Sequence, residues 1–113
     1  MEMLYERCGG LDIGKDEVVA CVRTPDGAGG RRQEVRTYKN FTSHLQALSD
    51  WLAAEGVTNV VMEATGQYWK PIWYVLEEQE FELMLVNARQ ARILPGRKTD
   101  VGDAAWLCEL LEH

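Results

Sequence analysis

The chain has 113 residues, which is enough for one domain with its own hydrophobic core. Hydrophobic residues make up 46% and charged residues 27%, the balance of an ordinary globular protein. No apolar run approaches the roughly 20 residues that span a bilayer, and the first seven residues carry two acids and no apolar segment, unlike a signal peptide. The three cysteines form no CxxC pair, which argues against a zinc site and a secreted disulfide framework. We therefore expect reduced thiols in a cytoplasmic protein without a membrane partner.

The formal net charge of −6 is distributed unevenly along the chain. Residues 1–40 carry seven acids and seven bases, residues 41–88 carry seven acids and one base, and residues 89–113 carry four of each. The acidic excess therefore lies in the middle third, with bases on either side of it. This total argues against tight, unspecific DNA binding by the domain alone, but it leaves room for a basic rim around one site.

The first forty residues predict three antiparallel strands. Leu11–Ile13 leads into a turn at Gly14–Asp16, and the apolar, β-branched run Val18–Val22 follows. Glycine-rich residues 25–30 predict a second turn, and the alternation in Glu34–Lys39 predicts a half-exposed edge strand.

The hydrophobic period then changes from strand to helix. Spacings of four, three and four place four apolar residues on one helical face, which we expect in the core: Phe41, Leu45, Leu48 and Leu52. Thr42 or Ser43 is expected to cap the start of this helix, and Gly56 its end.

The second half of the chain predicts alternating strands and helices. We expect a strand buried on both faces at Asn59–Glu63, a helix from Tyr68 or Trp69 to Gln79, and a strand at Phe81–Val86. A polar, basic connection at 87–99 leads to a closing helix at Asp100–Glu112. The order βββαβαβα predicts an α/β fold with a mixed sheet and helices on both of its faces.

Four carboxylates stand out from the acids that solvate helix surfaces. Asp12 lies between apolar strand residues, where a carboxylate is costly to bury unless it is paired. Glu63 ends a strand, and in crossover topologies ligands gather at the carboxyl ends of parallel strands. Asp100 and Asp103 are three residues apart at a helix start, so they project from one face.

Structural interpretations of these acids remain open. Asp100 and Asp103 could stabilise a helix N-terminus through the macrodipole, and Glu63 could be a turn acid. Asp12 is the hardest to explain in this way, because a strand interior disfavours aspartate. A set of oxygen ligands without His or Cys suits Mg²⁺ or Mn²⁺. Two such ions, roughly 3.5–4 Å apart, can hold the attacking and leaving oxygens of a phosphodiester.

Three motifs occur in order along the chain: Gly10-Leu11-Asp12-Ile13-Gly14-Lys15, Met62-Glu63-Ala64-Thr65-Gly66-Gln67-Tyr68 and Arg97-Lys98-Thr99-Asp100-Val101-Gly102-Asp103-Ala104. Together they resemble the DEDD transposases of bacterial insertion sequences, which are relatives of the Piv-type DNA invertases. The resemblance covers essentially the whole chain. It is specific because all three motifs are present in the right order.

The resemblance implies a ribonuclease-H-like domain, similar to the Holliday-junction resolvase RuvC, over residues 1–113. It implies that the acidic tetrad is Asp12, Glu63, Asp100 and Asp103, and that these residues are catalytic and bind Mg²⁺ or Mn²⁺, as two ions. The implied activity is metal-dependent DNA strand cleavage and transfer in a bacterial cytoplasm. The implied partners are DNA, further copies of the full-length protein in a dimer or larger assembly, a C-terminal domain that carries a serine and, in some members, a structured guide RNA.

The chain ends within an apolar helical pattern, so we interpret it as an excised catalytic domain without the C-terminal transposase domain. Such a fragment could be inactive on its own. Residues 111–113 are either native sequence or the start of a tag.

Five bases are candidate DNA contacts: Lys15, Arg89, Arg92, Arg97 and Lys98. The alternative is that they are solvated, or that they neutralise the acidic site. Four aromatic residues could form a base-stacking platform, although helical spacing favours a core role for them: Tyr68, Trp69, Trp73 and Tyr74.

Two other functions compete with the transposase interpretation. One is a phosphotransferase fragment of the actin–hexokinase type, whose first strands also carry an Asp-x-Gly turn. That fold needs a second glycine-rich motif and a longer chain, and it does not explain Asp100 with Asp103. The other is a metal-free nucleic-acid-binding module of the same fold, which the presence of all four acids disfavours.

Overall fold

The computed structural model describes residues 6–64, 66–87 and 103–112. Its elements are β1 (Cys8–Ile13), β2 (Glu17–Pro25), β3 (Arg31–Lys39), α1 (Thr42–Ala54), β4 (Asn59–Ala64), α2 (Trp69–Glu77), β5 (Glu82–Asn87) and α4 (Asp103–Glu112). These elements follow the predicted order βββαβαβα. The predicted connection at 87–99 and the predicted helix start at Asp100 lie almost wholly outside the residues that the structure describes.

The sheet has five strands in the order β3-β2-β1-β4-β5. The central strand β1 pairs antiparallel with β2 and parallel with β4, so the sheet is mixed, as predicted. The strand β3 lies at one edge and is the most exposed, which confirms the prediction for Glu34–Lys39. The strand β4 is buried on both faces from Val60 onward, also as predicted.

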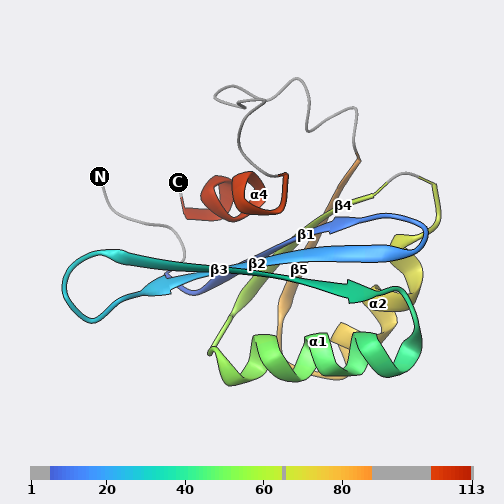
Figure 1. Cartoon of the computed structure of the whole chain (residues 1–113), viewed down its shortest axis with the longest axis horizontal. Helices are drawn as coiled ribbons and strands as arrows, with labels where there is room; N and C mark the ends of the chain where they lie inside the picture. Colours follow the sequence, from blue (N-terminus) through green and yellow to red (C-terminus); the bar gives the residue numbers. More distant parts are fainter. Residues whose placement is uncertain (1–5, 65, 88–102, 113) are drawn as a thin grey trace.

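Helices cover both faces of the sheet, giving three layers (Figure 1). The helices α1 and α2 cover one face, where Leu11, Ile13 and Met62 belong to the larger core cluster. The helix α4 covers the other face, where its Leu107 and Cys108 pack on Val61. Because side chains alternate along a strand, each central strand sends every second residue to α4. Within the described ranges, no helix is long and apolar enough to cross a membrane.

The start of α1 differs from the prediction. Phe41 has extended backbone angles (φ −119°, ψ 149°) and is itself the N-cap, with no side-chain hydrogen bond at the cap. The expected cap at Thr42 or Ser43 is therefore wrong, since the helix has already begun at Thr42. Phe41 precedes the first helical residue, so the helical spacing does not carry its side chain into the core, and it is 61% exposed. The predicted end at Gly56 is confirmed, with φ +72°.

All three cysteines are free and buried where α4 packs on the sheet, Cys108 on the helix and Cys8 and Cys21 on the strands, as the prediction of reduced thiols requires. The Cys108 thiol donates to the carbonyl oxygens of Cys21 at 3.0 Å and Cys8 at 3.4 Å. The neighbouring thiols of Cys21 and Cys8, together with burial, raise the pKa of Cys108 far above its ordinary value. These contacts fasten α4 to the two strands beneath it.

Candidate active site

Asp12 and Glu63 are brought together by the parallel pairing of β1 with β4. They are direct register partners on neighbouring strands, whose spacing is about 4.8 Å. Their neighbours Leu11 and Met62 pack in the core beneath α1 and α2, so both carboxylates lie on the opposite face, under α4. Glu63 is only 5% exposed and Asp12 is half-buried. Two acids from distant parts of the sequence therefore share one position on the sheet.

The helix α4 reaches this face because Gly10 leaves room for it. Gly10 lies two residues before Asp12 and points to the same face. A Cβ atom at Gly10 would lie 2.2 Å from the carbonyl oxygen of Ala104 and 2.9 Å from the backbone nitrogen of Cys108. Such distances cannot be accommodated without moving the helix, because the atoms in contact are backbone atoms. The helix thus lies in direct backbone contact with β1.

The direction of α4 points its first residue toward the two acids. Ala104 lies against Gly10, whereas Cys108 also reaches Cys8. Glu109 pairs with Arg23, the register partner of Cys8, so the helix runs opposite to β1. Its N-terminal end consequently faces the carboxyl end of β1, as Figure 1 shows. Asp103 is the first residue of α4, although its side chain is not among the described features. Asp100 lies outside the described residues.

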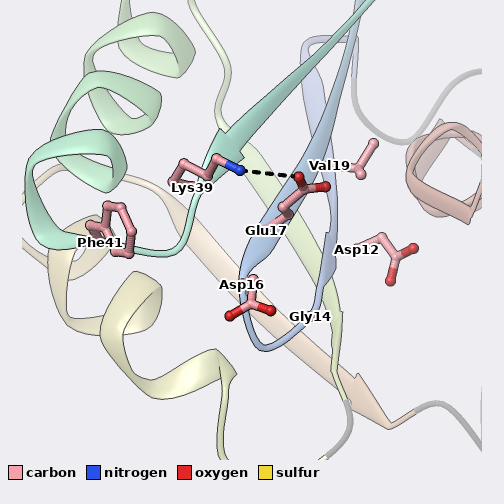
Figure 2. Close-up of a pocket in the computed structure, with 7 residues that line it drawn as sticks. All are labelled: Asp12, Gly14, Asp16, Glu17, Val19, Lys39 and Phe41. Atoms are coloured by element: carbon pink, nitrogen blue, oxygen red, sulfur yellow. Dashed lines mark hydrogen bonds and ion pairs between the residues drawn. The ribbon is translucent and has the colours of Figure 1, made fainter.

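A cleft of about 710 Å³ opens beside Asp12, away from Glu63 and over the β1–β2 turn. Its lining comprises Asp12, Gly14, Asp16, Glu17, Val19, Lys39 and Phe41, drawn in Figure 2. Lys39 forms an ion pair with Glu17 at 3.5 Å, and both side chains are more than half exposed. The cleft therefore joins the carboxylate site to the exposed end of β3.

The predicted DNA-contact residues fall mainly outside this description. Lys15 is exposed in the turn between β1 and β2, and it does not line the cleft. The other four candidates lie outside the described residues: Arg89, Arg92, Arg97 and Lys98. Of the aromatic residues, Trp69 and Trp73 pack partly against the core as expected, whereas Tyr68 and Tyr74 are exposed.

Three residues at this site escaped prediction: Gly10, Lys39 and Phe41. Gly10 belongs to a quoted motif, but its role depends on a helix ninety residues away. Lys39 was visible only as the last base of an edge strand. The helical spacing predicts a core position for Phe41, whereas its extended backbone places it before the helix and its side chain is exposed.

The donor set fits a hard divalent cation. The acids placed here offer only carboxylate oxygens, which are the ligands that Mg²⁺ and Mn²⁺ prefer. Over the part of the chain with described placement, no group of three or more His, Cys, Asp or Glu residues is arranged to hold a metal ion. Two of the four predicted ligands, Asp12 and Glu63, are described with their side chains, and these two are adjacent.

The arrangement of sheet and helices is that of RuvC-like resolvases. The structure of RuvC from Thermus thermophilus in complex with a Holliday junction substrate matches with a TM-score of 0.65 at 10% identity, covering 92% of this chain and 90% of that chain. A Thermus thermophilus RuvC structure matches with 0.57 at 13% identity over 76% and 66%. The fowlpox virus Holliday junction resolvase matches with 0.53 at 10% identity over 72% and 60%. The fold is therefore ribonuclease-H-like, which confirms the predicted fold class.

A family model described as transposase, of the DEDD type named for IS110, matches residues 9–113. The chain belongs to this family of DEDD transposases, which confirms the resemblance drawn from the three motifs. The comparison with curated proteins gives no match.

Proposed function

We propose that the chain is the catalytic domain of a DNA transposase that cleaves and transfers DNA strands with two divalent metal ions, Mg²⁺ or Mn²⁺. In this proposal Asp12, Glu63, Asp100 and Asp103 hold the ions. The observation that carries it is the direct pairing of Asp12 with Glu63 on one face of the sheet, under a helix whose first residue is Asp103. Membership of the transposase family supports DNA as the substrate.

The two described carboxylates have different tasks. Asp12 is on the central strand, which is hydrogen-bonded on both sides, so its position is held rigidly and suits a ligand shared between ions. Glu63 is buried on the neighbouring strand and would ligate from one side. When bound, the ions polarise the phosphate and activate an oxygen nucleophile.

Asp103 would approach the same ions from above the sheet. The Gly10 contact sets how closely the start of α4 lies to β1, the strand that carries Asp12. Asp100, which lies outside the described residues, would be the fourth ligand. The nucleophile in this scheme is a water molecule, a DNA 3′-hydroxyl or the serine of a C-terminal domain.

The proposed partners of this protein are based on its family and on the solved structures that are similar to it. One of the similar structures is described as a complex with a Holliday junction substrate, which makes branched DNA the first substrate to test. A C-terminal domain, a guide RNA and self-association in the full-length protein are further proposals that rest on the family resemblance. The family match favours this function over a phosphotransferase fragment or a metal-free module.

The test is Mn²⁺ binding by titration calorimetry, combined with cleavage of labelled branched DNA. We expect Asp12→Asn to lower the Mn²⁺ affinity at least tenfold and to abolish any cleavage, with little loss of stability, because the substitution removes a ligand charge and keeps the shape. Asp50→Asn on the exposed side of α1 is the matched control and should behave like the wild type. Unchanged Mn²⁺ affinity in Asp12→Asn would contradict the proposal.

A further inference from the structure

We propose that the cleft beside Asp12 holds one nucleotide of the DNA strand next to the scissile phosphate, with Lys39 contacting a backbone phosphate and Phe41 stacking on a base. The inference deepens the proposed function and rests on it. It assigns a binding role to two residues that lie outside the acidic motifs.

The position of the cleft is the first argument. Asp12 is part of its wall, so a strand whose phosphate meets ions at Asp12 has the cleft directly beside it (Figure 2). The volume of about 710 Å³ is ample for one nucleotide. The cleft is also open to solvent, so the DNA strand can continue beyond it. Val19 contributes an apolar surface to the lining.

Lys39 supplies the charge that a phosphate needs. It is the one cation among the described residues that line the cleft. It lies on the α4 face, because its cross-strand partner Glu17 shares that face with Val19 and Cys21, which follow at every second position of β2. Its ion pair with Glu17 is exposed, and exposed pairs contribute little free energy. Glu17 therefore holds the ammonium group beside the cleft, where a phosphate can contact it as well at little cost in free energy.

Phe41 supplies a stacking surface. It is 61% exposed at the N-cap of α1, and its ring meets His44 edge to face, with the ring centroids 5.6 Å apart and an interplanar angle of 86°. In an edge-to-face contact His44 covers at most one face of the Phe41 ring, so at least one face is available for a base. Stacking on an exposed aromatic ring is the usual way in which proteins hold single-stranded nucleic acid without reading its sequence.

The charges of the cleft agree with a strand that arrives together with metal ions. Asp12, Asp16 and Glu17 make the empty lining acidic, which disfavours DNA. In the proposed complex the ions compensate Asp12, and Lys39 bridges Glu17 and the phosphate. Binding in the cleft should consequently depend on the divalent ion, with Lys39 and Phe41 adding to the affinity.

The test is fluorescence anisotropy of labelled branched DNA with single-stranded arms, in Ca²⁺, over a series of salt concentrations. We expect Lys39→Ala to weaken binding and to make the slope of log K against log salt shallower by roughly 0.7–0.9, the loss of one phosphate contact. Lys39→Arg should retain the slope. Arg32→Ala is the matched control, because Arg32 is on the same strand, also pairs with a glutamate and points to the opposite face.

For the aromatic arm, we expect Phe41→Ala to lower the DNA affinity about tenfold with an unchanged salt slope, and Phe41→Trp to restore it. Tyr74→Ala on α2 is the control, since Tyr74 is similarly exposed at 62%. Mn²⁺ affinity should stay at the wild-type value in all these variants, which separates the cleft from the metal site.

Wild-type DNA binding in both Lys39→Ala and Phe41→Ala would overturn the inference, and so would equal losses in the two controls. If Asp12→Asn loses Mn²⁺ while the cleft variants bind DNA normally, only the cleft inference fails. If the wild-type chain binds no Mn²⁺, the proposed function fails instead. An absence of any DNA binding in Ca²⁺ at low salt would also overturn the inference.

Discussion

Gly10 and Asp12 are neighbours on one face of the central strand β1. The role of each residue depends on the size of its side chain. The absence of a side chain at Gly10 admits the backbone of α4, whereas the carboxylate of Asp12 lies on the same face beside its register partner Glu63 on β4. Asp12 is thereby enclosed between β4, α4 and the cleft. Its place in a strand, which disfavours aspartate on local grounds, is explained by this tertiary setting.

The raised pKa of the Cys108 thiol leads us to expect that the free energy of unfolding depends on pH. The pKa of this thiol is raised in the folded protein, so the folded state keeps a proton that the unfolded thiol releases above its ordinary value of about 8.5. The free energy of unfolding should therefore be unaffected by this group below pH 8.5 and should fall above it. The maximal slope is about 1.4 kcal/mol per pH unit for one thiol.

Urea unfolding at pH 7.5 and pH 9.5 measures this effect. The decrease in the free energy of unfolding should be smaller in Cys108→Ala than in the wild type, because the titrating thiol is gone. Rapid alkylation of Cys108 by iodoacetamide in the native protein at pH 7.5 would contradict its burial.

At the scale of the elements, the position of α4 is the feature that the proposed metal site requires. Gly10→Ala should push the helix away from β1, cost about 1–3 kcal/mol of stability through overpacking, and lower the Mn²⁺ affinity severalfold. Calorimetry with Mn²⁺ and urea unfolding on the same variant measure the two effects.

Gly9→Ala is the matched control for this prediction. A Cβ at Gly9 would lie 3.3 Å from the end of the Leu52 side chain on the α1 face, where a flexible group can yield. This variant should be somewhat less stable but should bind Mn²⁺ normally. Equal Mn²⁺ affinities in Gly10→Ala and Gly9→Ala would show that the position of α4 on β1 does not affect the metal site.

The elements themselves were predictable because each has a local signature. Alternation, helical spacing and glycine turns located every described strand and helix, and the order of the elements indicated a mixed sheet. Phe41 was misplaced because a spacing of four is meaningful only between residues that are both helical. The contact between Gly10 and Ala104 was beyond sequence reasoning, since no local pattern records which strand a late helix will cover.

For the whole molecule, the net charge of −6 predicts how DNA binding should respond to metal. Without divalent ions the acids repel the phosphates, so affinity for branched DNA should be low in EDTA. Addition of Ca²⁺ at constant ionic strength should raise the affinity for branched DNA. An ion that acted only by screening would instead lower the affinity, because it would weaken the attraction between Lys39 and the phosphates. Anisotropy titrations in EDTA and in Ca²⁺, matched in ionic strength with KCl, measure the difference. Equal affinities in the two buffers would contradict a role for the ions in holding DNA.

The candidate site was predictable in composition and only partly in geometry. The motifs named Asp12 and Glu63, and the topology explains why they meet at the ends of two parallel strands. The cleft was not predictable, because its wall combines a turn, the end of an edge strand and a helix cap, and their approach depends on packing over the whole sheet.

Side chains alternate between the two faces of β1, so Gly10 and Asp12 share a face only while they are an even number of residues apart. A one-residue insertion between Gly10 and Asp12 would turn the carboxylate toward the apolar layer beneath α1, and a one-residue deletion would have the same consequence. Length changes of a single residue are therefore forbidden there, whereas the hairpin at Asp26–Gly30, remote from the acids, has no such restriction. Functional relatives should accordingly vary in the length of this hairpin. They should keep an even number of residue steps between the glycine that contacts α4 and the aspartate that corresponds to Asp12.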